Sequence, residues 1–305
     1  MAEVPAAKSV PFTVTAKARN IHVVECEFVS QLDSLWILLS SDRHHDNPHT
    51  DHALELKHLR EARDRGAGII DVGDLFCAMG GKADPRRMKH GTTRQEHATA
   101  NDYFDSLVRH AADFYAPFAR QFIVIGRGNH ETSILKHQET DLTERLCERM
   151  ATISSIPVHS GGYGGWVSFR ITAKQTCRYA LNLKYFHGSG GGGLMTMDTL
   201  RVRRIASWTP DADVIVGGHT HDQWIMSIER ERLSSMNGDY KIATSTQHHV
   251  RCGTYKDEYE DGFGGFHVER GGPPKPLGAV WMRIFLASSG KKDRYRLDTQ
   301  FFRAN

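Results

Sequence analysis

The sequence has little of what marks exported, membrane-spanning or disulfide-rich proteins. Its 305 residues contain five cysteines, an odd number with no Cys-x-x-Cys spacing, so neither a disulfide framework nor a thiolate zinc site is expected. Residues 1–8 lack the apolar segment of a secretory signal, and no run approaches the roughly 20 apolar residues of a membrane span. These absences predict a cytoplasmic protein that does not associate with membranes.

The sequence also lacks a strong charge of either sign. The formal net charge is +3, an excess too small to indicate a polyanionic partner by itself. The hydrophobic fraction of 39% and the charged fraction of 25% are those of an ordinary globular protein. Because no linker-like composition or internal repeat interrupts the chain, we expect one domain spanning residues 1–305.

Histidine is abundant, with 18 residues. Since histidine is the commonest metal ligand in proteins and a frequent acid or base, this abundance makes a metal site worth seeking.

Five short apolar runs end in polar or glycine-rich segments, as strands covered on both faces do. They cover residues 35–39, 68–72, 122–125, 179–186 and 214–216. Helical patterns alternate with them at 50–66 (with Thr50 as N-cap), 96–120, 141–150 and 195–208. This alternation predicts an α/β fold with a largely parallel sheet region. Further strands are expected at 224–228, 240–245 and 280–286, and an extra edge strand within the first thirty residues.

Each of the five predicted strands is followed by side chains that can bind a metal. In chain order they are Asp42, His44, Asp74, Asn129, His187, His219 and His221. Ligands of open α/β sheets bind at the carboxyl ends of the strands, so these side chains are expected to converge. Carboxylate, amide and imidazole donors without thiolate suit manganese, iron or zinc. Their number is sufficient for two adjacent ions, as in two-metal sites that promote displacement at phosphorus.

The same residues fall into five short motifs. They are Asp42-Arg43-His44, Gly73-Asp74, Gly128-Asn129-His130-Glu131, His187 and Gly218-His219-Thr220-His221. In this order the motifs resemble the signature blocks of the calcineurin-like metallophosphoesterase superfamily, and the resemblance spans residues 35–221. It implies a four-layer α/β/β/α sandwich of two mixed sheets flanked by helices.

The resemblance also implies a role for each ligand. Asp42, His44 and His221 would hold one metal, Asn129, His187 and His219 would hold the other, and Asp74 would bridge them. His130 would be catalytic, protonating the leaving oxygen or steadying the transition state. The cofactors would be two divalent metal ions, with manganese expected and iron, zinc or magnesium as alternatives.

The activity implied is hydrolysis of phosphate esters by in-line attack of a metal-bound hydroxide, with phosphodiesters favoured, as in a nuclease or phosphodiesterase. Two alternatives stay open: a phosphomonoesterase acting on nucleotides or phosphoproteins, and a non-catalytic binding module of the same fold. The subfamily is also open, because Gly73 to Phe76 resembles repair nucleases whereas Arg127 to Glu131 resembles Ser/Thr protein phosphatases. Cys77 stands where many members carry a second acid.

Four further residues are candidate substrate contacts: Arg43, Arg127, Gly188 and Arg251. Gly188 opens a glycine-rich tract that is either a flexible connection or a phosphate-facing backbone. Basic side chains gather in two segments that leave ligand-bearing loops, namely Lys82, Arg86, Arg87, Lys89, His90 and Arg94, and then Arg201, Arg203 and Arg204. Such charges are often only a solvated face, but they favour DNA or RNA slightly over small phosphate esters as the partner.

Overall fold

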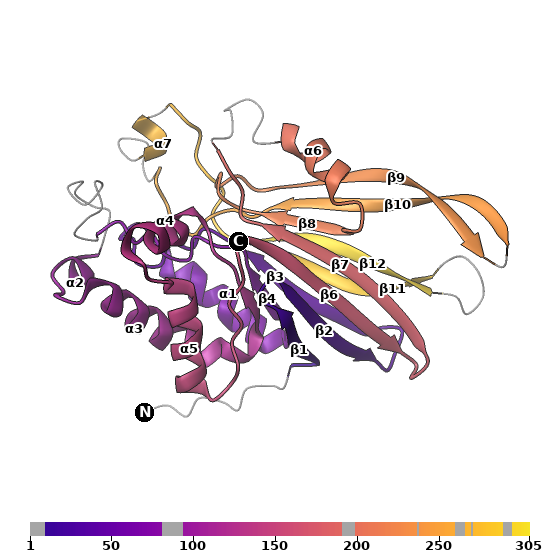
Figure 1. Ribbon diagram of the computed structural model, residues 1–305, viewed down its shortest axis with the longest axis horizontal. Coiled ribbons are helices and arrows are strands. Elements are labelled where there is room, and N and C mark those ends of the chain that lie inside the picture. The colour runs from indigo at the N-terminus through magenta and orange to yellow at the C-terminus, as the bar shows by residue number, and fades with distance from the viewer. Residues whose placement is uncertain are drawn as a thin grey trace.

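Two mixed β-sheets packed face to face form the frame of the protein (Figure 1). The computed structural model describes residues 10–80, 94–190, 199–236, 238–259, 266–269, 271–288 and 295–305. One sheet has seven strands in the order β1-β2-β6-β7-β8-β10-β9, and the other has five in the order β12-β11-β3-β4-β5. The expected sandwich of two mixed sheets is confirmed.

The seven-stranded sheet combines parallel and antiparallel pairs. Its strands are β1 (Phe12–Ala18), β2 (Ile21–Phe28), β6 (Gly164–Ala173), β7 (Cys177–Phe186), β8 (Val214–Gly217), β9 (Trp224–Met236) and β10 (Asp239–Arg251). The pairs β2–β6, β7–β8 and β8–β10 are parallel, and the others are antiparallel. The extra edge strand expected near the N-terminus is present as β1.

The five-stranded sheet holds the first three predicted strands side by side. Its strands are β3 (Ser34–Ser40), β4 (Gly68–Asp71), β5 (Phe122–Ile125), β11 (Ala279–Ser288) and β12 (Tyr295–Ala304). The pairs β3–β4 and β4–β5 are parallel, whereas β11 runs antiparallel to both β3 and β12. The parallel pairing predicted from the sequence is therefore present in both sheets, in β3–β4–β5 here and in β7–β8–β10 of the other sheet, and antiparallel strands extend each region.

Helices flank the sandwich. They are α1 (His52–Arg65), α2 (Gln95–Ala98), α3 (Tyr103–Tyr115), the 3₁₀-helix η1 (Ala116–Gln121), α4 (Asn129–Gln138), α5 (Leu142–Ser154), α6 (Leu200–Trp208) and α7 (Phe266–Glu269). In Figure 1, α1, α3 and α5 gather on the side of the five-stranded sheet, whereas α6 lies beside β8 and β10. Within the described residues, no helix has both the length and the apolar character needed to cross a bilayer.

Two apolar cores hold these layers together. The first lies between the sheets and joins residues such as Val167 and Leu183 of one sheet to Ile37 and Val280 of the other. The second lies under the helices, where Leu59 and Leu146 pack with side chains from the other face of the five-stranded sheet. Because β3, β4 and β5 are covered on both faces, their sequences read as continuous apolar runs.

The helix boundaries differ from the prediction in several places. The N-cap of α1 is Asp51, whose carboxylate accepts from the Leu54 amide at 2.9 Å, whereas the hydroxyl of Thr50 donates to the His44 carbonyl at 2.7 Å. The helix expected over 96–120 is divided into α2, α3 and η1. For the helix expected over 195–208, residues 195–198 lie outside the described part of the chain. Helix α4 and strands β2, β6 and β12 are additional elements.

Candidate metal centre

The carboxyl ends of five strands meet at one edge of the sandwich and bring the predicted ligands together. Asp42 and His44 follow β3, Asp74 follows β4, and Asn129 follows β5 in the five-stranded sheet. His187 follows β7, and His219 and His221 follow β8 in the seven-stranded sheet. The side chains converge because the two sheets face each other, which the sequence pattern alone does not specify.

One group of ligand atoms comes from Asp42, His44 and His221, and all of them lie within 4.8 Å of one another. The two Nε2 atoms of His44 and His221 are 3.3 Å apart, and Asp42 Oδ1 lies 3.4 Å from Nε2 of His221. Tetrahedral ligands about 2.0–2.2 Å from an ion are separated by about 3.3–3.6 Å, so the spacing fits a divalent cation.

The buried Oδ1 of Asp42 supports this fit. Asp42 is fully buried, and its Oδ1 has no hydrogen-bond partner among the described residues. Burial alone would raise the pKa of this carboxyl, but the charge of His221, whose Nε2 lies 3.4 Å from Oδ1, holds it well below its usual range. A cation in this group would satisfy a buried carboxylate oxygen that otherwise has no partner.

A second group combines Asp74, His187 and His219, and Asn129 lies against it. Nε2 of His187 is 3.1 Å from Asp74 Oδ2 and 3.2 Å from Asn129 Oδ1, which in turn lies 2.6 Å from Nδ1 of His219. Burial lowers the pKa of His187, but the charge of Asp74 outweighs it and raises the value to about 9. A bound cation would take the place of the proton that the two side chains otherwise share.

The two groups are directly connected. The backbone amide of His219, in the second group, donates to Asp42 Oδ2 of the first at 2.8 Å. Burial opposes ionisation of Asp74, but the charges of His187, His130 and His44 hold its pKa well below the usual range. His44 belongs to the first group, so Asp74 lies within electrostatic reach of both.

Five of the seven predicted ligands have left-handed backbone conformations. Their φ angles are 52° for Asp42, 46° for His44, 54° for Asp74, 74° for His219 and 57° for His221. Such conformations cost about 1–3 kcal/mol each in a non-glycine residue and persist only where the surrounding structure imposes them. Their concentration at the strand ends indicates that tertiary contacts impose these unfavourable backbone angles, and the angles direct the side chains toward one another.

Neighbouring groups fix the orientation of the ligands. The Nδ1–H of His187 donates to the Val72 carbonyl at 3.1 Å, which directs Nε2 toward Asp74 and Asn129 as the nitrogen that would bind a metal. The amide of His130 donates to Asp74 Oδ1 at 2.9 Å. A Cβ at Gly218 would overlap Asp42 Oδ2 and the Ser41 hydroxyl, so only glycine allows this close approach.

Glu131 is a central support that the sequence did not single out. Its Oε2 accepts from the amides of Gly128 at 2.8 Å and Asp74 at 3.2 Å, and its Oε1 accepts from the Phe76 amide at 2.8 Å. Burial and the charge of Asp74 raise the pKa of this carboxyl to about 8. Its bond to the amide of the N-cap Gly128, three residues earlier, is the half of a capping box that a glycine N-cap still allows, and the sequence therefore lacks the Ser/Thr signal that would have identified it.

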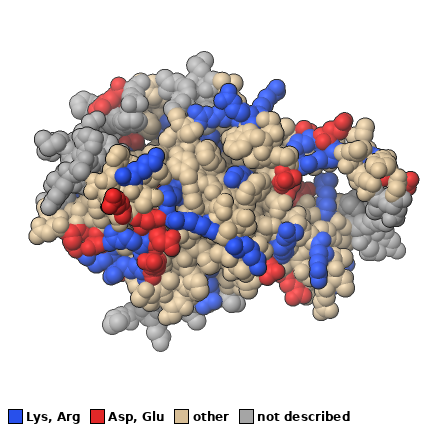
Figure 2. All heavy atoms as spheres, viewed as in Figure 1, with Lys and Arg blue, Asp and Glu red and all other residues tan. Residues whose placement is uncertain are grey.

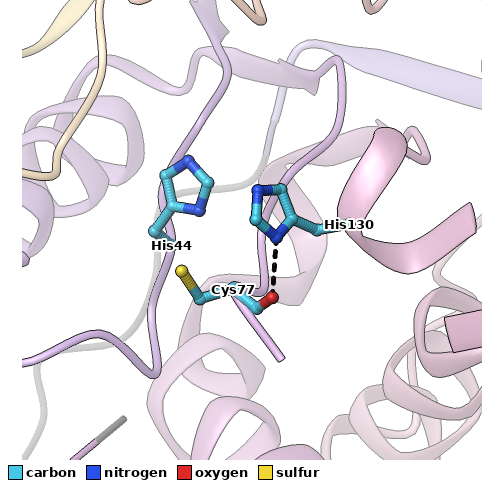
Figure 3. A group of neighbouring side chains, drawn as sticks. All are labelled: His44, Cys77 and His130. Atoms are coloured by element: carbon cyan, nitrogen blue, oxygen red, sulfur yellow. Dashed lines mark hydrogen bonds between the residues drawn. The ribbon is translucent and has the colours of Figure 1, made fainter. Parts of the chain in front are cut away.

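His130 lies beside both groups. Its ring Nδ1 donates to the Cys77 carbonyl at 2.7 Å, which places Nε2 toward Asp74, 3.9 Å from Oδ2. Its ring centroid is 5.0 Å from that of His44 (Figure 3). The side chain is 15% exposed, so it is accessible from solvent while its tautomer is set by the protein.

Of the four predicted substrate contacts, Arg43 requires a correction. Its side chain is completely buried and forms ion pairs with Asp71 at 2.6 Å and Glu55 at 3.0 Å. Its guanidinium also lies over the Tyr255 ring, 5.0 Å from the centroid. Arg43 cannot contact a substrate in this structure, because its guanidinium is buried between Glu55 of α1 and Asp71 of β4.

The other three predicted contacts lie close to the ligands. Arg127 forms an ion pair with Asp141, the N-cap of α5. Arg251 donates to the Gly218 carbonyl at 2.7 Å, and with Gly188 it lines a small cavity of about 30 Å³ under α6. Gly188 has a φ of 130°, and its carbonyl accepts from the Tyr163 hydroxyl at 2.6 Å. Of the basic residues predicted to flank the site, Lys82, Arg86, Arg87, Lys89 and His90 lie outside the described residues.

Comparison with known proteins gives no close relative. No family model matches the sequence, and no curated protein matches it. Among solved structures, a conserved uncharacterized protein from Streptococcus pneumoniae TIGR4, a predicted phosphoesterase, has 9% identity and a TM-score of 0.33, covering 89% of this chain and 99% of that chain. GAP50, the anchor in the inner membrane complex of Plasmodium, has 10% identity and a TM-score of 0.39, covering 89% and 85%. Similarities this low establish no relationship, so the interpretation of the site rests on its own residues.

Proposed function

We propose that this protein is a metal-dependent phosphoesterase of the calcineurin-like superfamily with a two-metal centre. The observation that carries the proposal is the pair of connected ligand groups, Asp42/His44/His221 and Asp74/His187/His219, with Asn129 against the second. Two divalent cations bound there would activate the attacking water and stabilise the phosphoryl oxygens. Manganese is the proposed metal, since the donors are oxygen and imidazole nitrogen.

His130 is the proposed acid of the reaction. The Cys77 carbonyl fixes the proton of Nδ1, so Nε2 is the atom that faces the centre and exchanges a proton. When a phosphate ester binds, its negative charge stabilises a second proton on the ring, and Nε2 delivers that proton to the departing oxygen. Asp74 accepts from the His130 amide and so positions this residue relative to the ligands.

The described basic side chains near the centre are already paired, which favours a phosphodiester over the more highly charged phosphomonoester. A diester carries one negative charge at phosphorus, whereas a monoester at neutral pH carries up to two and needs more cationic compensation. Arg43 and Arg127 are occupied with carboxylates, and Arg251 donates to the Gly218 carbonyl. Lys256 and Lys275 are likewise paired, with Glu258 and Asp222. We therefore propose diesters, including DNA or RNA, as the substrate class.

The test is hydrolysis by metal-stripped protein after reconstitution with manganese, iron, zinc or magnesium. Diester substrates with a p-nitrophenyl and with an alkyl leaving group are compared in wild type, His130→Gln and His137→Gln. His137 is an exposed histidine on the same helix and serves as the matched control.

The wild type and the control are expected to cleave both diesters only with metal. His130→Gln should retain its metals and lose about 10²–10⁴-fold in turnover of the alkyl diester. The loss should be much smaller for p-nitrophenolate, which departs without a proton. Equal losses on both substrates would show that His130 is not the acid, and metal binding without hydrolysis of any ester would favour a binding module.

A further inference from the structure

Cys77 is a buried thiol held at the edge of the metal centre. Its backbone amide donates to Asp46 Oδ1 at 2.6 Å and its carbonyl accepts from His130, so both sides of the residue are fixed. The Asn47 amide group donates to its Sγ at 3.4 Å. Figure 3 shows the sulfur pointing toward the His44 side chain, while the carbonyl of the same residue bonds to His130.

Three ligand atoms of different residues converge at this place. The sulfur of Cys77 and one ring nitrogen each from His44 and His130 lie within 4.8 Å of one another. Nε2 of His44 faces His221, which leaves Nδ1 on the side of Cys77 and His130. His44 is only 2% exposed, so water cannot easily reach this Nδ1, and among the described residues it has no hydrogen-bond partner. On His130, Nε2 carries the lone pair because Nδ1 donates to a carbonyl.

We propose that Cys77, His130 and His44 form a third cation site, selective for thiophilic ions such as Zn²⁺ and Cd²⁺, whose occupation inhibits the enzyme. A sulfur ligand with two imidazoles suits these ions, whereas the oxygen-rich groups beside it suit manganese or magnesium. Inhibition rests on the proposed role of His130, because a ring that binds a cation through Nε2 cannot deliver a proton. Binding of the cation itself does not depend on that role.

The sulfur donor of Cys77 sets the selectivity, because manganese and magnesium prefer oxygen ligands whereas Zn²⁺ and Cd²⁺ bind thiolate strongly. Burial and, secondarily, the nearby Asp46 charge raise the pKa of the Cys77 thiol to about 12 against the opposing charge of Lys256. The free thiol is therefore protonated and a poor nucleophile at neutral pH, which argues against an oxidation switch. A thiophilic cation forms the S–metal bond and releases the thiol proton to solvent, and ligation through His44 releases the Nδ1 proton as well.

Only small side-chain movements are needed to close the site. Ligands of a four-coordinate ion with sulfur and nitrogen donors lie about 3.3–3.8 Å apart, against the present upper limit of 4.8 Å. Of the three residues, His130 is the one exposed to solvent, with 15% of its side chain accessible, whereas Cys77 and His44 are buried.

The experiment adds Cd²⁺ to manganese-reconstituted protein carrying Cys177→Ser, which removes the exposed thiol. Thiolate-to-cadmium absorption in the ultraviolet and bound Cd²⁺ per chain are measured together with the ratio of activity with and without Cd²⁺. Cys77→Ser is compared with Cys147→Ser, which changes an equally buried thiol in α5.

We expect one absorbing Cd²⁺ per chain and at least tenfold inhibition in the background protein and in Cys147→Ser, and neither in Cys77→Ser. Absence of the absorption band would overturn the site. Equal inhibition in Cys77→Ser would overturn it too, since Cd²⁺ would then act by replacing manganese. Because the absorption is measured independently of turnover, a protein without phosphoesterase activity would refute the proposed function and still test the cation site.

Discussion

Replacing Arg43 with methionine tests whether this residue is a structural ion-pair partner or a substrate contact. The side chains of Arg43, Asp71 and Glu55 are all fully buried, and Arg43 also donates to the Ser40 hydroxyl at 2.9 Å. Burial raises the pKa of Asp71, and the Arg43 charge is the strongest influence that opposes it. Without the guanidinium, two carboxylates remain buried near each other with no cation between them.

Removing one partner of a buried ion pair costs about 3–5 kcal/mol. With an unfolding entropy of about 2.1 cal/mol/K per residue, the 305 residues give roughly 0.64 kcal/mol/K, so Tm should fall by roughly 5–8 °C. The exposed Arg60 on α1 is the matched control, and Arg60→Met should change Tm by less than about 1 °C.

Thermal unfolding and steady-state kinetics are measured on the same preparations. The triple variant Arg43→Met, Glu55→Gln, Asp71→Asn should recover part of the lost stability, because no uncompensated charge remains. KM of the folded single variant should stay close to that of wild type. An unchanged Tm combined with a large rise in KM would refute the buried ion-pair explanation and would indicate that Arg43 contacts the substrate.

Three further changes probe other parts of the structure. Glu131→Ala leaves three buried amides without an acceptor, so the free energy of unfolding should fall by at least about 3 kcal/mol in chemical denaturation; a change below 1 kcal/mol would contradict the assigned contacts. Gly218→Ala should lower metal content measured by elemental analysis, because its Cβ overlaps Asp42 Oδ2, whereas Gly238→Ala has no such overlap. Burial and then the His159 charge lower the pKa of His22 from 6.5 to about 4. The unfolded chain therefore binds a proton at His22 at a higher pH than the folded chain does. The free energy of unfolding should decline as pH falls from 6.5 toward 4, and it should decline less steeply in His22→Leu. The same pH dependence of the free energy of unfolding in both proteins would refute this assignment.

The strands that precede the ligands were predictable because a strand buried on both faces has a continuous apolar sequence. Residues such as Ile37, Ile70 and Val124 lie in continuous apolar runs that need no knowledge of their neighbours in space. Strand β6 was missed although its buried residues alternate with more exposed ones, which is the period-two pattern of a strand covered on one face. Helix α4 was missed because it begins at Asn129, within the ligand loop itself.

The sequence by itself determined the ligand types, their order and their positions after apolar strands, because these depend on local pattern and side-chain chemistry. Only the tertiary structure decided that the strands divide between two facing sheets, with Leu39 of β3 pairing with the distant Val280 of β11. It also decided that Arg43, adjacent to a ligand, points into the core, and that Cys77 lies between two histidines. The direction of a side chain depends on left-handed backbone angles and on contacts between residues far apart in the chain, and neither is encoded in the spacing of residue types.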